Sequence, residues 1–135
     1  MSAVCVRVCV GREHYAVPVE HVLEVAESGD VAPVPGAPAQ IMGVRNLRGQ
    51  IVPVISLAKL FGLADEESGR IVVAELGGRR GGLAVESVLD VGELPEVSEA
   101  TESPYLDGAA LVDGTLVGLL DVEQILSSSQ PQGSR

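Results

Sequence analysis

Alternation of apolar and polar residues is the clearest local pattern in this chain. Residues 4–10 place a valine at every second position, and this period of two predicts a strand with one buried face. Apolar runs rich in valine and isoleucine at 14–19, 41–47 and 50–55 predict three more strands. The first half of the chain therefore has the signature of short paired strands joined by turns.

Two proline features modify this prediction. Residues 30–40 carry three prolines, which donate no N–H to a ladder, so we expect an extended loop there. Pro53 lies inside the strand at 50–55, which predicts an edge position or a bulge.

Helical spacing follows each of two strand pairs. Leu57, Leu60 and Phe61 are spaced as on a helix, and Ser56 is placed to cap it. The spacing recurs over 122–126, with Asp121 in the capping position. Two short helices are predicted.

The same pattern occurs twice along the chain. Residues 19–25 match 85–91 at five of seven positions, with an offset of 66. Residues 49–57 match 114–122 at an offset of 65. A duplicated unit of half the chain restricts the fold to two similar lobes. Positions alike in both copies serve the fold, and positions that differ are candidates for function.

The second copy has its own turns and loops. It opens with a strand at 70–76, a glycine-rich turn at 77–82 and a return strand from Leu83. Residues 94–104 are acidic and correspond to the proline loop of the first copy. A unit of five short strands closes most easily into a small barrel, because closure removes exposed edges. We predict an all-β protein of two five-stranded barrels side by side, with a groove between them.

The repeat also sets the expected boundaries. The two lobes are predicted at about 11–67 and 68–127, preceded by the first strand at 4–10. Residues 128–135 are polar and cannot bury enough apolar surface to offset the entropy of ordering, so we expect a disordered tail.

Composition supports the all-β prediction and narrows the function. Hydrophobic residues make up 46% of the chain but aromatic residues only 2%, so the core is built from valine, leucine, isoleucine and alanine, and the β-branched excess favours strands. The formal net charge of −10 opposes binding to nucleic acid and to anionic membrane surfaces. No nucleic-acid partner and no direct membrane contact are expected.

The cysteine pattern argues against a disulfide. Cys5 and Cys9 on one strand would lie ~13 Å apart, beyond disulfide reach, so we expect free thiols in a reducing compartment. The start of the chain lacks a signal-peptide pattern, and no apolar run is long enough to span a membrane. The predicted location is the cytoplasm.

The chain lacks the sequence motifs typical of several enzyme classes. No Gly-x-Ser-x-Gly motif occurs, and no Cys/His cluster has metal-ligand spacing, so no metal or cofactor is predicted. Many carboxylates lie in loop-like runs, where a solvated surface explains them better than an acid–base pair. The residues at 77–82 lack the Lys-Ser/Thr ending of a phosphate loop.

The informative difference between the copies is a single arginine. Arg48-Gly49 in the first copy becomes Asp113-Gly114 in the second, so the turn glycine is kept and the arginine is not. An arginine at a strand end beside a groove can bind a carboxylate through two hydrogen bonds. An ordinary surface arginine is the alternative.

The stretch 42–55 resembles the signature of CheW-like domains through Gly-Val-Arg-Asn-Leu-Arg-Gly-Gln-Ile-Val-Pro-Val. The similarity extends to 15–19, 82–88 and 105–108, and in all it covers about residues 4–127. The resemblance implies a single domain over 1–127, built of two SH3-like barrels with short helices. Ser56 departs from the aspartate usual in the family, although both residues can cap a helix.

The resemblance further implies a non-catalytic adaptor of bacterial chemosensory arrays. Such adaptors bind the cytoplasmic tips of chemoreceptors (methyl-accepting chemotaxis proteins) and the regulatory domain of a CheA-type histidine kinase. By match to the family, the receptor-binding residues are Val22, Glu24, Gly43 and Arg48. We expect Glu24 and Arg48 to form an ion pair at the mouth of the groove, on adjacent strands of one barrel. Weaker candidates for kinase contact are the edge residues Ile51, Val52, Val54, Leu116 and Val117.

Two other functions stay open at this stage. One is an accessory CheW-like protein that binds receptors without activating the kinase. The other is a small hydrolase that uses surface carboxylates, which would need an apolar pocket that raises the pKa of one carboxylate.

Overall fold

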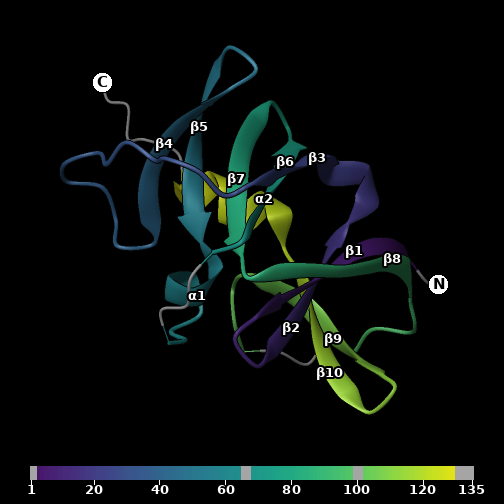
Figure 1. Cartoon of the computed structure of the whole chain (residues 1–135). Helices are drawn as coiled ribbons and strands as arrows, with labels where there is room; N and C mark the ends of the chain where they lie inside the picture. Colours follow the sequence, from purple (N-terminus) through teal and green to yellow (C-terminus); the bar gives the residue numbers. More distant parts are fainter. Residues whose placement is uncertain (1–2, 65–67, 99–101, 130–135) are drawn as a thin grey trace.

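Ten strands in two sheets make up most of the chain, as a computed structural model describes for residues 3–64, 68–98 and 102–129 (Figure 1). One sheet has the strand order β8-β1-β2-β10-β9 and the other the order β3-β6-β7-β5-β4. The strands are β1 (Ala3–Val10), β2 (Glu13–Pro18), β3 (Val22–Glu27), β4 (Ile41–Leu47), β5 (Gln50–Ser56), β6 (Arg70–Leu76), β7 (Arg79–Val85), β8 (Ser87–Leu94), β9 (Leu106–Val112) and β10 (Thr115–Leu120). The short helices are η1 (Val19–His21), α1 (Leu57–Leu60) and α2 (Val122–Ser129). The predicted all-β class with two five-stranded units is confirmed.

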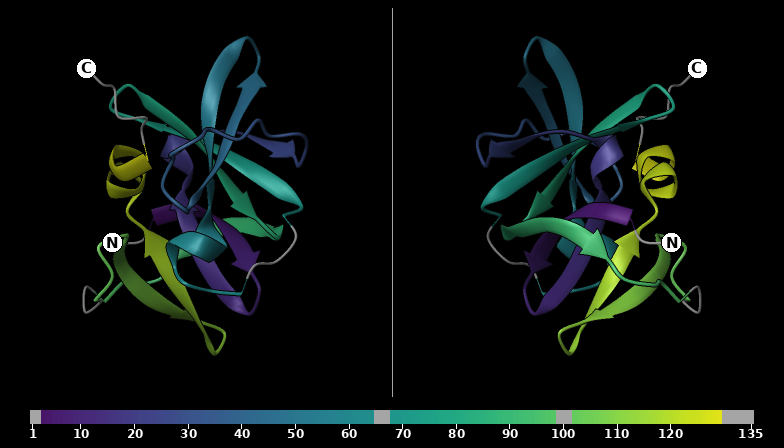
Figure 2. Two further views of the ribbon diagram at one scale, coloured as in Figure 1. Left: turned by 90° about the vertical axis from the view of Figure 1, so that its left-hand side faces the viewer. Right: turned by 90° about the vertical axis from the view of Figure 1, so that its right-hand side faces the viewer.

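The two sheets form two lobes, one above the other in Figure 1 and seen from its sides in Figure 2. We call the sheet formed within 22–85 the continuous lobe. The sheet formed by 3–18 and 87–120 is the split lobe, because the continuous lobe interrupts it in sequence. The predicted boundaries at 11–67 and 68–127 are therefore wrong.

An exchange of equivalent hairpins explains this error. The β1–β2 hairpin pairs with β10, and the β6–β7 hairpin pairs with β5, through parallel ladders in both cases. When each strand is replaced by its counterpart five places along the chain, one strand order becomes the other. The repeat is thus real, but each copy of the sequence contributes strands to both sheets. The period of a repeat in the sequence shows which segments are equivalent. It does not show in which of the two sheets each hairpin pairs.

Close backbone contacts recur in both copies. Gly43 and Gly108 have φ of 151° and 154°, and a Cβ atom on them would lie 2.2 Å and 2.3 Å from the carbonyl oxygens of Ala32 and Ser98. A side chain cannot fit at either place, so glycine serves the fold there.

Three clusters of buried side chains hold the molecule together. The largest joins both sheets and α2, with Val8 of β1, Leu83 of β7 and Ile125 of α2 among its members. Each lobe also has a small interior cluster, to which all five of its strands contribute. These are Cys5, Ala16, Leu94, Ala110 and Val117 in the split lobe, and Val54, Ile71, Val73 and Ala84 with the flanking Ala26 and Leu47 in the continuous lobe. Because edge strands meet in each interior, each sheet curls into a barrel.

Both faces of β1 are buried over much of its length. Val6, Val8 and Val10 face the shared core, as the alternation predicts, whereas Cys5 fills the interior of the split lobe. Both cysteines are free, as predicted.

Each predicted helix cap is present. The Oγ atom of Ser56 accepts from the backbone N–H of Lys59 at 3.1 Å, and Oδ1 of Asp121 accepts from that of Gln124 at 3.0 Å. Helix α2 continues to Ser129, which is buried, so the tail predicted from residue 128 begins too early. Residues 130–135 lie outside the described part of the chain. In the described ranges, no helix has the length and apolar character needed to cross a membrane.

Two local predictions need correction. The turn predicted at 77–82 is confined to Gly77-Gly78, and Gly81 and Gly82 belong to β7. A Cβ atom at Gly81 would lie 2.7 Å from Leu126, so this glycine allows α2 to approach the sheet. Pro53, predicted at an edge or a bulge, is at neither: β5 lies between β7 and β4, and the register shift of the β4–β5 ladder falls between Ile41 and Gly43. Its missing N–H is tolerated because the ladder to β7 begins only at Val54.

Candidate functional site

The β4–β5 hairpin tip holds an arginine in an unusual backbone conformation. Arg48 and Gly49 have φ of 53° and 84°, the two positive angles of a type I′ turn. Asn46 supports the turn, because its Oδ1 atom accepts from the N–H of Gly49 at 3.0 Å. Asn, Asp and Gly are the residues that favour the first of these positions. Asp113 occupies the equivalent place in the split lobe, with φ of 50°, so the turn geometry does not account for the arginine.

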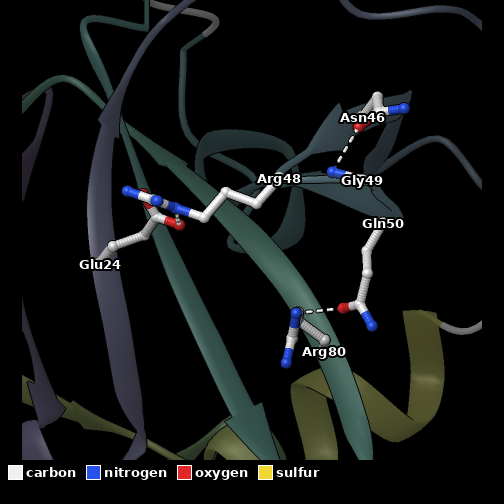
Figure 3. Close-up of polar contacts among 6 residues, drawn as sticks. All are labelled: Glu24, Asn46, Arg48, Gly49, Gln50 and Arg80. Atoms are coloured by element: carbon white, nitrogen blue, oxygen red, sulfur yellow. Dashed lines mark hydrogen bonds and ion pairs between the residues drawn. The ribbon is translucent and has the colours of Figure 1, made fainter.

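Arg48 forms the ion pair predicted with Glu24. The Nε atom of Arg48 donates to Oε2 of Glu24 at 2.8 Å, and the two side chains are 80% and 27% exposed (Figure 3). The hydrogen bond from Arg48 lowers the pKa of Glu24, and the same bond raises the pKa of Arg48. The pair is therefore ionised on both sides at neutral pH.

The prediction of adjacent strands for this pair is wrong. Glu24 lies on β3 and Arg48 follows β4, and these strands are the opposite edges of the sheet. A second arginine makes a similar link, because Nη1 of Arg45 donates to the carbonyl oxygen of Glu27 at 2.7 Å. Both contacts cross between the edge strands of the curled sheet, so the site lies where the continuous lobe closes.

In the split lobe, the carboxylate equivalent to Glu24 is paired with a different arginine. Asp90 corresponds to Glu24 and accepts two hydrogen bonds from Arg7, from Nε at 2.8 Å and from Nη2 at 2.7 Å. Arg7 lies directly opposite Asp90 on the neighbouring strand β1. The pKa of Asp90 is lowered by the hydrogen bond from Arg7. The carboxylate is thus paired with an arginine of the turn in the continuous lobe and with an arginine of the sheet in the split lobe, whose turn carries Asp113. An exposed arginine at the tip of this hairpin is specific to the continuous lobe.

The other two predicted receptor residues take part in the packing of the fold. Val22 is half-buried and packs against the core shared by the two lobes. Gly43 is buried beneath the loop at Ala32, and the equivalent glycine of the split lobe does the same. Gly43 therefore has a structural role, and its receptor contact stays a prediction.

Burial also divides the predicted kinase-contact residues. Ile51 and Leu116 are each 65% exposed and occupy equivalent positions on the two lobes. Val52, Val54 and Val117 are buried, because their side chains point inward along alternating strands, so their prediction as contact residues is wrong.

Sequence reasoning missed several exposed apolar side chains. Leu111, also 65% exposed, is paired across the strands with Leu116. Leu23 and Leu89 are both exposed at the register shifts of β3 and β8, where each is skipped in the ladder. Leu111 and Leu116 lie two residues before and two residues after the Asp113-Gly114 turn, so the signal for their pairing was present in the sequence. The bulges were not visible in the pattern.

The proline loop lines a pocket of about 260 Å³ on the continuous lobe. Its lining residues are Val34, Pro35, Gly36, Ala37, Pro38, Ile41, Val44, Pro53, Ser128 and Ser129. The lining contains no carboxylate, so it does not provide the acid required for a hydrolase. Within the described residues, no group of three or more His, Cys, Asp or Glu side chains is placed to hold a metal ion.

The comparisons with known proteins agree with this architecture. A family model described as "CheW-like domain" matches residues 4–130. The Chemotaxis protein CheW of Klebsiella aerogenes is 32% identical over 132 residues, which cover 90% of this chain and 80% of that protein. The Chemotaxis protein CheW of Thermotoga maritima is 32% identical over 125 residues, covering 87% and 83%. The scaffolding protein TtCheW from Thermoanaerobacter tengcongensis has a similar crystal structure, with a TM-score of 0.77, 28% identity and 90% of each chain covered. The chain belongs to the family of CheW-like domains.

Proposed function

We propose that this chain is a non-catalytic adaptor that couples the cytoplasmic tips of chemoreceptors to a CheA-type histidine kinase. Its relatives carry the name of a chemotaxis protein, and its structural neighbour is described as a scaffolding protein. The observation that carries the proposal is the Glu24–Arg48 pair, whose arginine lies at an exposed hairpin tip that carries Asp113 in the other lobe. The work of the protein is then binding and orientation, in the cytoplasm beside the receptor array.

The chemistry of the pair suits recognition of a charged helix. Arg48 presents a planar guanidinium with five N–H donors, and Glu24 engages it through Nε. The remaining face of the group is accessible and can bind a carboxylate on a receptor helix. Glu24 holds the guanidinium in place, which lowers the entropy that binding must overcome.

Two exposed apolar positions support the kinase contact. Ile51 and Leu116 project from equivalent strands of the two lobes, one on each. A regulatory domain built from two similar barrels could engage either lobe end to end. Alternating contacts of this heterologous kind close into rings when the rotation allows it.

Reconstitution tests the receptor contact. Kinase autophosphorylation is measured with a receptor cytoplasmic fragment and the kinase, with and without this chain. We expect the wild-type chain to activate the kinase and Arg48→Asp to abolish activation, because charge reversal repels both Glu24 and the receptor carboxylate. The midpoint of thermal unfolding should stay nearly unchanged, since the Arg48 side chain is exposed.

Asp113→Asn in the matching turn serves as the control and should behave as wild type. Full kinase activation by Arg48→Asp would refute the receptor role, and a large fall in thermal stability would make Arg48 structural.

Pull-down of the kinase regulatory domain tests the second partner. We expect Leu116→Asp to weaken that capture, and a wild-type chain that binds receptor without ever capturing kinase would be an accessory protein.

A further inference from the structure

Arg80 is a half-buried arginine of the β6–β7 hairpin. The proposed function assigns no role to it. It lies on β7 directly opposite Glu75 of β6, and its Nη2 atom donates to Oε2 of Glu75 at 3.0 Å. It lies on the same face of β7 as Gly82 and Ala84. Ala84 belongs to the interior cluster of the continuous lobe. The side chain of Arg80 is 31% exposed, and its Nε atom is buried.

A second contact joins Arg80 to the hairpin that carries Arg48. Nη1 of Arg80 donates to Oε1 of Gln50, which is the first residue of β5 and directly follows the Arg48-Gly49 turn (Figure 3). One guanidinium therefore links β6, β7 and β5 at the base of the turn. This gives Arg80 a direct mechanical connection to the backbone that holds Arg48 at positive φ.

Arg80 also acts on the other member of the ion pair. Its positive charge adds to that of Arg48 in lowering the pKa of Glu24. The hydrogen bond from Arg48 is the largest cause of this lowered pKa, and the charge of Arg80 is the smallest.

The repeat indicates that the fold does not require this network. The positions of Arg80, Gln50 and Glu75 are filled in the split lobe by His14, Thr115 and Cys9. Both barrels form, although only the continuous lobe has arginine, glutamine and glutamate at these three positions. This is also the lobe that carries Arg48 in its turn. The Nε atom of Arg80 is buried without a hydrogen-bond partner among the described residues, and so is Nδ1 of His14 at the equivalent position, so this cost is common to both lobes.

We propose that Arg80 is a positioning residue of the receptor site. It fixes the Arg48 turn through its hydrogen bond to Gln50, so it sets receptor affinity by acting through Arg48. This inference rests on the proposed receptor role of Glu24 and Arg48. Its predicted signature is a change in affinity that disappears once Arg48 is removed.

Calorimetry with the full chain and a purified chemoreceptor cytoplasmic-tip fragment tests the inference. We expect Arg80→Gln to weaken binding about three- to tenfold. Arg79→Gln is the matched control, because it removes the same charge from the neighbouring exposed residue of the same strand, and it should bind within about twofold of wild type. Added to Arg48→Gln, the Arg80→Gln change should cause no further loss, since its effect passes through Arg48.

A pH readout separates positioning from general stability. The titration midpoint of the Glu24 carboxyl, followed by NMR, should rise in Arg80→Gln and stay low in Arg80→Lys, which keeps the charge. Arg80→Lys should recover part of the lost affinity, because lysine cannot reach Gln50 and Glu75 together as a fork.

Several outcomes would overturn the inference. They are wild-type affinity in Arg80→Gln, a loss that multiplies with that of Arg48→Gln, or an unchanged Glu24 midpoint. If Arg80→Gln fails to fold, receptor affinity is measured with Arg80→Lys instead. Wild-type affinity of Arg80→Lys, with its contact to Gln50 broken, would then overturn the positioning role. If instead Arg48→Asp binds the fragment as well as wild type, the proposed receptor site itself fails, whatever Arg80 does.

Discussion

Arg48 combines two features that rarely occur together in one residue. Its backbone has a φ of 53°, which a β-carbon disfavours, and its side chain is mostly exposed and paired to Glu24. Strained positions of this kind persist where function requires the side chain. The equivalent turn carries Asp113, a residue suited to that conformation. The arginine is therefore best explained by what it binds.

Replacing Arg48 with asparagine should separate stability from binding. Asparagine tolerates positive φ, so we expect an unchanged or slightly higher midpoint of thermal unfolding. Affinity for a receptor tip fragment should fall, because asparagine cannot reach Glu24 or a partner carboxylate as a guanidinium does. Calorimetric titration and thermal unfolding of the same sample check both expectations. Normal receptor affinity in Arg48→Asn, or a marked drop in its stability, would contradict this explanation.

At the scale of elements, three aromatic rings join parts of both lobes. Tyr15 of β2 stacks on Phe61, which follows α1, with ring centroids 4.6 Å apart. Tyr105, which precedes β9, meets the edge of Phe61 at 6.3 Å. They are all the aromatic residues of the chain. The connection after α1 thereby packs between elements of the split lobe, which fixes how the lobes meet.

Burial of Tyr15 should make this junction sensitive to alkali. Desolvation raises the pKa of Tyr15 from 10 to about 12. Because the folded state holds this proton more tightly, its stabilisation is complete below pH 10 and is lost as pH rises from 10 toward 12. We expect a loss on the order of 2 kcal/mol over that range. Urea unfolding at several pH values should show this loss in wild type and a smaller one in Tyr15→Phe. Identical pH profiles of the two proteins would contradict it.

Local elements were predictable because their causes are local. Valine alternation located β1, and the side chains of Ser56 and Asp121 located the starts of α1 and α2. The pair of Glu24 and Arg48 was also predicted, although through the family resemblance. The bulge at Leu23 was not, because a register shift depends on the partner strand. Burial of Val52 was misjudged because inward and outward faces are set only when the sheet curls.

At the scale of the whole molecule, the exchange of hairpins ties the lobes together. The largest buried cluster contains side chains from both sheets and from α2. Helix α2 follows β10 of the split lobe and yet packs on β6 and β7 of the continuous lobe. Neither lobe can bury its apolar surface alone, so we infer that relative orientation of the two barrels is rigid. A rigid orientation suits an adaptor, whose output is the geometry that it imposes on its partners.

Cooperative unfolding of both lobes tests this rigidity. Leu126 of α2 is fully buried and lies against Gly81 of β7, so Leu126→Ala should destabilise the protein by about 2–5 kcal/mol. If the lobes share one core, hydrogen exchange at Val54 in the continuous lobe and at Val117 in the split lobe should accelerate by the same factor. Leu116→Ala, at an exposed position, is the control and should change neither rate by more than about twofold. Faster exchange at Val54 alone would mean that the lobes unfold independently, and geometric coupling through a rigid adaptor would then lose its physical basis.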